Sequence, residues 1–218
     1  MPSLTEENYL KAILTLSVQG ENVQVNDVAK HLQIKMPTVT SMMKKLAAKK
    51  LVHYESYKPL RLTDRGKREA SLIIRKHRLT EMFLVEKMGF GWEEVHEIAE
   101  QIEHIQSAAF FDKMDALLGH PKIDPHGEPI PDKAGKMEGR QFEKLSDCHI
   151  GDALVFCAVL NSSTDFLTFL NSRALKLGAT LKIESIEPFD GTMTVKVGSR
   201  REVLSKMVCE KLLVEKAK

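Results

Sequence analysis

The stretch from residue 33 to residue 50, QIKMPTVTSMMKKLAAKK, combines an apolar helix face with a row of hydroxyl and lysine side chains. Pro37 suits the first turn of a helix. Four apolar side chains then recur at the spacing that buries one helix face: Val39, Met42, Met43 and Leu46. A shorter helix with Asn26 as its N-cap comes before it, across a turn of a few residues. Two short helices joined in this way predict a helix-turn-helix, whose second helix enters the major groove of DNA.

The residues around these helices predict a wing and a supporting helix. Residues 51–54 and 60–62 alternate like two short strands around YESYKP, and a helical pattern runs over about residues 6–16. Lysines would neutralise phosphates, while Thr and Ser can reach base edges or phosphate oxygens. The residues expected to contact DNA are Lys35, Pro37, Thr38, Thr40, Ser41, Lys44, Lys45, Lys58 and Arg61. The alternative is that the lysines only form a solvated helix surface.

The charge is divided unevenly along the chain. The net charge is +2, but residues 1–80 carry 15 Lys and Arg against 7 Asp and Glu, which indicates a surface for a polyanion. Residues 81–130 carry 11 Asp and Glu against 3 Lys and Arg. Carboxylates at that density repel one another unless a cation joins them.

The bulk composition is that of an ordinary globular protein. Of the 218 residues, 43% are hydrophobic, and no apolar run is long enough to span a membrane. The start, MPSLTEENYLKAIL, lacks the features of a signal peptide. The three cysteines form no CxxC motif and leave one unpaired, so we expect a reduced, cytoplasmic setting.

The stretch from residue 92 to residue 104, WEEVHEIAEQIEH, predicts a helix with a cluster of possible metal ligands. At ~100° per residue, four side chains fall within about a 100° arc of one face. They are His96, Glu100, Glu103 and His104. The alternative is a stripe of solvated charge.

Further helices are expected over about residues 64–87, capped by Thr63-Asp64, and 107–118. A stretch rich in proline and glycine follows, and part of it reads as a tether. From Lys144 onward the pattern changes to short strands with glycine turns, interrupted by a helix at about residues 165–177. This part predicts a small β-barrel.

Five segments resemble one protein family. They are EENYLKAI near the start, RKHRLTEMFL at 75–84, VHEIAEQIEH at 95–104, GHPKIDPHGEPIP at 119–131 and FLNSRALKLGATLKI in the β-rich part. Together they are similar to the diphtheria-toxin-repressor/MntR (DtxR) group of metal-dependent transcriptional repressors. The resemblance covers nearly the whole chain in order.

The resemblance implies a mainly α protein with a small β domain. Residues 1–63 would form a winged helix-turn-helix DNA-binding domain and residues 64–131 a helical dimerisation and metal-binding domain. Residues 132–143 would be a linker, and residues 144–218 an SH3-like FeoA-type barrel. The implied function is that of a homodimer which, loaded with Mn²⁺ or Fe²⁺, binds operator DNA and represses metal-uptake genes.

The resemblance also implies two metal ions per subunit. One site would use His77, Glu81, Asp124, His126 and Asp165, with His96 as a further ligand or as a neighbour that hydrogen-bonds a ligand. The other would use Glu100, Glu103, His104 and Asn8. Family members commonly have methionine or aspartate at the position of Asn8, and some manganese sensors have glutamate at the position of Lys11. Some relatives have cysteine at the position of Asp124. An uncharged Asn8 predicts a weaker second site, and Lys11 argues against a compact two-metal cluster.

Several alternatives stay open at this point. His77 and Glu81 can be read as a surface ion pair, and Asp124 and His126 as ordinary loop residues. A hydrolase using the same His/Glu set would need a general base and a substrate pocket, and no HExxH motif is present. A third reading is a DNA-binding regulator that does not depend on metal.

Overall fold

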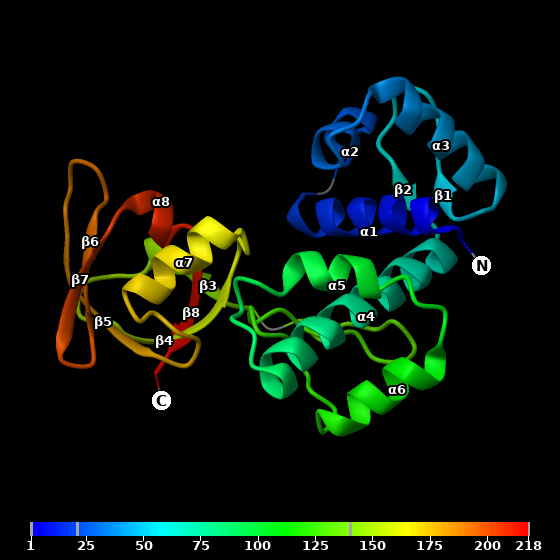
Figure 1. The fold of residues 1–218 in the computed structure, drawn as a ribbon. Helices are drawn as coiled ribbons and strands as arrows, with labels where there is room; N and C mark the ends of the chain where they lie inside the picture. Colours follow the sequence, from blue (N-terminus) through cyan, green and yellow to red (C-terminus); the bar gives the residue numbers. More distant parts are fainter. Residues whose placement is uncertain (1, 21, 140, 218) are drawn as a thin grey trace. The chain divides into compact units, whose positions relative to one another are not determined.

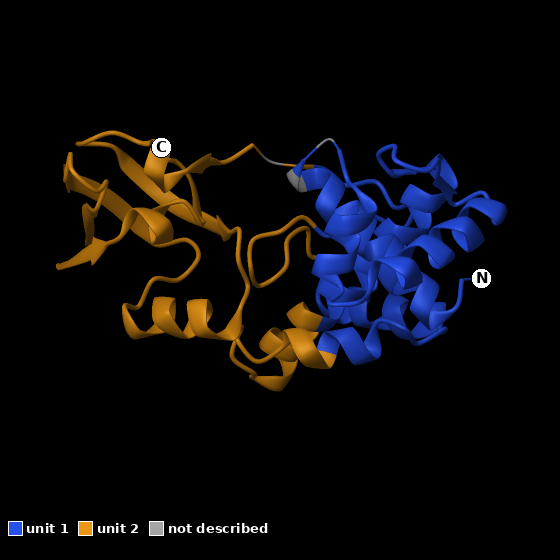
Figure 2. Cartoon of the chain, turned by 90° about the horizontal axis from the view of Figure 1, so that it is seen from above, with its two compact units in different colours: residues 1–80, 99–120, 130–138 blue, residues 81–98, 121–129, 139–218 orange. Residues whose placement is uncertain are grey.

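The computed structural model describes residues 2–20, 22–139 and 141–217 (Figure 1). The chain forms two compact units, which are coloured in Figure 2. Unit 1 consists of residues 1–80, 99–120 and 130–138, and unit 2 of residues 81–98, 121–129 and 139–218. The units therefore interleave along the sequence, and the division into three domains with a linker at residues 132–143 stays a prediction.

The winged helix-turn-helix belongs to unit 1. It comprises α1 (Leu4–Gln19), α2 (Val25–His31), α3 (Met36–Ala48), β1 (Val52–His53) and β2 (Arg61–Leu62), and β1 and β2 pair antiparallel. Side chains from all three helices and from the wing form one core, which includes Leu10, Ile13, Val28, Val39, Met43, Leu46 and Leu62. The predicted winged helix is confirmed, but the expectation that Asn26 is the N-cap of α2 is wrong, because α2 begins at Val25 with Gln24 as its N-cap.

Two of the next three helices carry residues of both units. These helices are α4 (Asp64–Met88), α5 (His96–Ile102) and α6 (Ala108–Leu117). The hydroxyl of Thr63 accepts a hydrogen bond from the Gly66 amide at 3.0 Å and so caps α4, as expected. The unit boundary falls inside α4, after Thr80, and inside α5, after Ile98.

The prediction of one helix over residues 92–104 is wrong. Residues 92–95 form turns, and α5 ends at Ile102, so Glu103 and His104 lie in a turn. The side chains of both residues bind partners on α1, as described below. If α5 continued through residue 104, the helix period would set the directions of the Glu103 and His104 side chains. In the structure their contacts with α1 set these directions instead.

The β-rich part of unit 2 is a six-stranded antiparallel sheet in the order β3-β8-β4-β5-β6-β7. Its strands are β3 (Glu143–Lys144), β4 (Ala153–Val159), β5 (Thr180–Ile186), β6 (Met193–Val197), β7 (Arg200–Leu204) and β8 (Leu212–Lys216). A 3₁₀ turn, η1 (Leu145–Asp147), and two helices, α7 (Thr164–Ser172) and α8 (Lys206–Cys209), complete it. Over the described residues β3 and β7 are the two edges, so the sheet is SH3-like but not closed.

Helix α7 is shorter than the expected 165–177. It ends at Ser172, and Ala174 then adopts a φ of 51°, in the left-handed region, which breaks the helix. The side chains of Leu167 and Leu170 point into the core of the sheet and are fully buried.

The loop at residues 121–129 belongs to unit 2 and follows β4 closely. The Val159 amide donates to the His126 carbonyl at 3.0 Å. Gly127 has a φ of 87°, and a Cβ at this position would lie 2.1 Å from the Cys157 carbonyl oxygen. Only glycine therefore fits here.

All three cysteines are free thiols. Among the described residues, the helices are too short or too polar to cross a membrane.

Candidate functional site

Three buried side chains of unit 2 form a compact group of possible metal ligands. Glu81 lies on α4, and Asp124 and His126 lie in the 121–129 loop; each is at most 3% exposed. Their ligand atoms all lie within 4.8 Å of one another. Two carboxylates and an imidazole in so small a buried volume suit a divalent cation that prefers oxygen and nitrogen.

Hydrogen bonds fix the direction of His126. Its Nε2 donates to the Trp92 carbonyl oxygen at 2.9 Å, and its Nδ1 lies 3.6 Å from Glu81 Oε2. A ring nitrogen that donates to a carbonyl leaves the other nitrogen available for a metal. The geometry therefore points Nδ1 toward Glu81 and away from Trp92.

The pKa of His126 is raised to about 9. Burial by itself lowers the pKa, but the carboxylates of Glu81 and Asp124 and the Trp92 carbonyl all favour the imidazolium and outweigh it. Without a cation in the group, the proton on His126 supplies a positive charge between the two acids.

Asp124 also shapes the loop that carries it. Its Oδ1 accepts hydrogen bonds from the amides of His126 at 2.8 Å and Glu128 at 2.9 Å. This side chain thus holds a tight turn and presents His126 at the same time.

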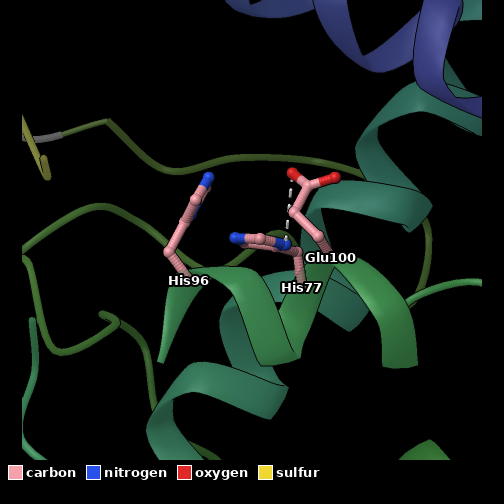
Figure 3. Close-up of side chains that lie close together, drawn as sticks. All are labelled: His77, His96 and Glu100. Atoms are coloured by element: carbon pink, nitrogen blue, oxygen red, sulfur yellow. Dashed lines mark ion pairs between the residues drawn. The ribbon is translucent and has the colours of Figure 1, made fainter. Parts of the chain in front are cut away.

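A second group, within unit 1, contains His77 on α4 and Glu100 on α5 (Figure 3). The dashed line in Figure 3 is the ion pair between His77 Nδ1 and Glu100 Oε1, which are 4.0 Å apart. His96 Nδ1 also lies 3.3 Å from Glu81 Oε1, in unit 2, so His96 is a neighbour of the first group.

Lys11 on α1 supplies a cation next to these ligands. Its ammonium donates to Glu103 Oε2 at 2.7 Å, to Glu100 Oε1 and to His77 Nδ1 at 3.1 Å. Glu103 is fully buried and also lies 2.5 Å from His77 Nδ1. An ammonium here does not fit a compact two-metal cluster, because it would repel a second cation.

A second contact between α1 and the turn after α5 involves Glu7. Its Oε2 lies 2.7 Å from His104 Nδ1, and its Oε1 accepts from Gln106 at 2.9 Å. His104 Nε2 lies 3.7 Å from Glu103 Oε1. A carboxylate on one nitrogen of a histidine orients the other nitrogen, as at many metal sites.

Two oxygens of the predicted second site are left without a hydrogen bond. Among the described residues, Asn8 Oδ1 and Glu103 Oε1 are buried and find no hydrogen-bond partner. Asn8 lies three residues before Lys11 on α1, a spacing that makes the two side chains neighbours on the helix surface. Unsatisfied buried oxygens carry a cost unless an ion or water joins them.

The structure brings together only part of the predicted first site. Glu81, Asp124 and His126 meet, whereas His77 lies with Lys11 and Glu103. Asp165, in the first turn of α7, is exposed and is in neither of the two groups found among the described residues.

Helix α3 has the surface expected of a recognition helix. Its Val39, Met43 and Leu46 are buried, and its opposite face exposes Thr38, Ser41, Lys44 and Lys45, with Lys35 and Pro37 exposed near its start and Thr40 half-buried. In the wing, Lys58 and Arg61 are exposed, and Lys58 pairs with Glu55 at 2.9 Å. Lys45 Nζ lies 3.1 Å from the buried carboxylate of Glu6, so Lys44 is the more available cation.

Sequence reasoning missed the roles of Glu7 and Trp92. Glu7 is four residues before Lys11, and that spacing was the available signal that the two side chains lie on the same face of α1. No pattern in the sequence indicated that Trp92 contacts His126.

Three family models match consecutive parts of the chain. They describe an iron-dependent repressor N-terminal DNA-binding domain over residues 2–60 and an iron-dependent repressor metal-binding and dimerisation domain over residues 63–132. A FeoA domain matches residues 143–216.

Curated relatives cover the N-terminal part of the chain. The iron-dependent repressor IdeR of Mycobacterium leprae is 34% identical over 127 residues, 58% of this chain and 55% of IdeR. The diphtheria toxin repressor of Corynebacterium jeikeium is 31% identical over 135 residues, 62% of this chain and 56% of that protein. The chain thus spans about half the length of these relatives.

Solved structures match over nearly the whole chain. A manganese-dependent transcriptional repressor in complex with manganese is 29% identical, with a TM-score of 0.88 over 97% of this chain and 100% of the other. ScaR with bound Zn²⁺ is 32% identical, with a TM-score of 0.80 over 99% of this chain and 100% of ScaR.

Proposed function

Because the chain belongs to the family of iron-dependent (DtxR-type) transcriptional repressors, we propose that it is a repressor that binds operator DNA when it holds a divalent metal. The observation that carries this proposal is the buried group of Glu81, Asp124 and His126 in a chain that also exposes a recognition helix. The family consists of repressors, so the protein is not an enzyme, and the hydrolase alternative loses its support.

Glu81, Asp124 and His126 are the proposed ligands of the principal metal, with His96 beside them and Asp165 as a further ligand from the β domain. Carboxylate and imidazole donors without a thiolate favour Mn²⁺ or Fe²⁺. Glu81, Asp124 and His126 would hold a divalent ion once His126 has lost its proton, and the charge of the ion would offset the repulsion between the two acids.

A second, weaker ion is proposed at Glu100, Glu103, His104 and Asn8, giving two per subunit. The buried oxygens without partners support this site. Lys11 already neutralises Glu100 and Glu103, which lowers the attraction of this site for a dication. We therefore place the tighter binding at Glu81, Asp124 and His126.

The proposed mechanism is linkage between metal and DNA. Helix α4 begins directly after strand β2 of the wing and carries both His77 and Glu81, so ligands and DNA-binding elements share one continuous segment. If the metal binds the DNA-competent state 100-fold better, the equilibrium shifts by about 2.7 kcal/mol.

The protein is proposed to act as a homodimer in the cytoplasm and to repress metal-uptake genes. The model for a metal-binding and dimerisation domain supports the dimer, and a two-fold protein matches a palindromic operator. The cytoplasm is where a repressor meets chromosomal DNA and where free thiols persist.

Operator-fragment binding with Mn²⁺, with Fe²⁺ under anaerobic conditions and with a chelator tests the proposal. We expect binding in metal and its loss in chelator, and Glu81→Gln should raise the metal concentration required. Equal DNA affinity in chelator and in metal would refute a metal-dependent repressor and favour the metal-independent regulator.

A further inference from the structure

Trp92 lies in the sequence next to the helical part of the chain, but its side chain belongs to the β domain. The indole is half-buried and packs against the core of the six-stranded sheet. Its Nε1 donates to Asn171 Oδ1 on α7 at 2.8 Å. The position of Trp92 therefore depends on how α7 sits on the sheet.

The same residue holds the imidazole of His126 in two ways. The Trp92 carbonyl oxygen accepts the hydrogen bond from His126 Nε2, and the indole stacks on the imidazole with ring centroids 5.9 Å apart and planes at 18°. The hydrogen bond fixes which nitrogen carries the outward proton, and the stacking fixes the plane of the ring.

The backbone around Trp92 and His126 is tied to the β domain as well. The Val159 amide on β4 donates to the His126 carbonyl, and Thr164 Oγ1 at the start of α7 donates to the Glu93 carbonyl at 3.2 Å. All of these contacts lie within unit 2. None of these contacts requires that a side chain of the β domain be a metal ligand.

We propose that Trp92 is a positioning residue through which the β domain sets the metal affinity of His126. The chain of contacts runs from Asn171 through the indole to the Trp92 carbonyl and on to His126 Nε2, leaving Nδ1 directed at Glu81. This inference rests on the proposed metal site at Glu81, Asp124 and His126. It does not depend on whether Asp165 is a ligand.

The test compares three substitutions on α7 in the full-length chain. Asn171→Leu keeps the size of the side chain but removes the acceptor for the indole N–H. Asn171→Asp keeps an acceptor oxygen. Ser172→Ala is the matched control, because Ser172 is exposed and its hydroxyl bonds the Phe169 carbonyl within its own helix. Thermal unfolding in chelator verifies that each variant is folded.

Mn²⁺ is titrated into each variant by calorimetry and by fluorescence. Trp92 is the only tryptophan of the chain, so its emission reports this location alone. Loss of a residue that orients a ligand typically weakens metal binding 10–100-fold. We expect Asn171→Leu to weaken the tighter binding event by about 10-fold and to change the Mn²⁺-induced quenching of Trp92, with Asn171→Asp and Ser172→Ala close to wild type.

The outcomes separate the inference from the proposed function. Glu81→Gln should weaken the tighter event and its quenching; if it leaves both unchanged, the metal site is wrong and the inference falls with it. If Glu81→Gln weakens that event while Asn171→Leu titrates like wild type, the metal site stands and the role of Trp92 is refuted. Equal weakening by Asn171→Leu and Asn171→Asp would also refute it, because the acceptor oxygen would then be irrelevant.

Discussion

The ammonium of Lys11 lies 2.7 Å from Glu103 Oε2, joining the middle of α1 to the turn that follows α5. Glu103 is fully buried, whereas Lys11 keeps 16% of its side-chain surface exposed. The same ammonium contacts Glu100 and His77. One fixed cation thus sits among three residues that the family resemblance assigns to metal ligation.

Lys11→Met should destabilise the protein in chelator. Removing one partner of a buried pair leaves the other charge uncompensated, and we expect a loss of about 2 kcal/mol, or several degrees in Tm. Mn²⁺ should recover more stability in the variant than in wild type, because Glu100 and Glu103 then lack their internal cation. Thermal unfolding in chelator and in Mn²⁺ measures both effects.

Lys58→Met is the control for Lys11, since the Lys58–Glu55 pair is exposed on both sides. Exposed pairs contribute little, so its Tm should stay near wild type in both conditions. A Lys11→Met protein with unchanged stability and unchanged response to Mn²⁺ would contradict the role assigned to this ammonium.

The raised pKa of His126, about 9, predicts two opposite pH dependences. Because the folded-state pKa lies above the unfolded value of 6.5, the proton stabilises the metal-free fold fully below pH 6.5, and this stability is lost as pH rises toward 9. Metal must displace that proton, so Mn²⁺ affinity should rise over the same interval. Calorimetry in buffers of different ionisation enthalpy should count about one proton released per ion bound to this site.

Substitution His126→Gln is the matched variant for the pH experiment. It should flatten the decline in stability of the metal-free protein between pH 6.5 and 9 and weaken the tighter metal site. Proton release that is the same in the variant and in wild type would assign the titration to another group.

Glu6 predicts a loss of stability in acid. Burial favours its neutral form, but Lys49, the Ser3 amide and Lys45 outweigh burial and lower the pKa of its carboxyl to about 2. A depressed pKa gives stability that is present above the unfolded value of about 4.5 and is lost as pH falls toward 2. Glu6→Gln should cost about 1–3 kcal/mol at neutral pH and shift acid unfolding, whereas Glu55→Gln on the exposed wing should not.

Lys44 and Lys45 should differ in their contribution to DNA binding. Glu6 engages Lys45, whereas Lys44 is exposed on the face of α3 opposite the core. Lys44→Ala should reduce the log–log salt slope by about one unit for each lost phosphate contact, and Lys45→Ala by less. Thr40→Ala or Ser41→Ala should instead change base preference. Salt titrations of operator and non-operator fragments separate the two effects.

Asp165→Ala tests whether the β domain supplies a ligand. If Asp165 binds the metal, the substitution should loosen one binding event and raise the Mn²⁺ concentration needed for DNA binding. Calorimetry on wild type and variant decides it. Two unchanged affinities would mean that the β domain acts on the metal only through contacts such as the one between Asn171 and Trp92.

The sequence alone was sufficient to predict those features that depend on residues within a single helix or strand. The helix-turn-helix follows from local periodicity and a proline in the first turn of α3, and the start of α4 follows from the cap at Thr63; all of these act within a few residues. The five family segments, read in order, identified the family and the fold. The predicted first site comprised His77, Glu81, Asp124, His126 and Asp165, and the structure brings Glu81, Asp124 and His126 together.

Only the tertiary structure decided which side chains share a site. Helical periodicity assigns a residue to a face, but the distance between atoms on two elements depends on how loops and cores place those elements. The end of α5 at Ile102 and the contacts that follow it are examples. His104 contacts Glu7, and Lys11 contacts Glu103. For the same reason no sequence pattern could show that a tryptophan packed on the β sheet would hold His126, since Trp92 and Asn171 are joined only by folding.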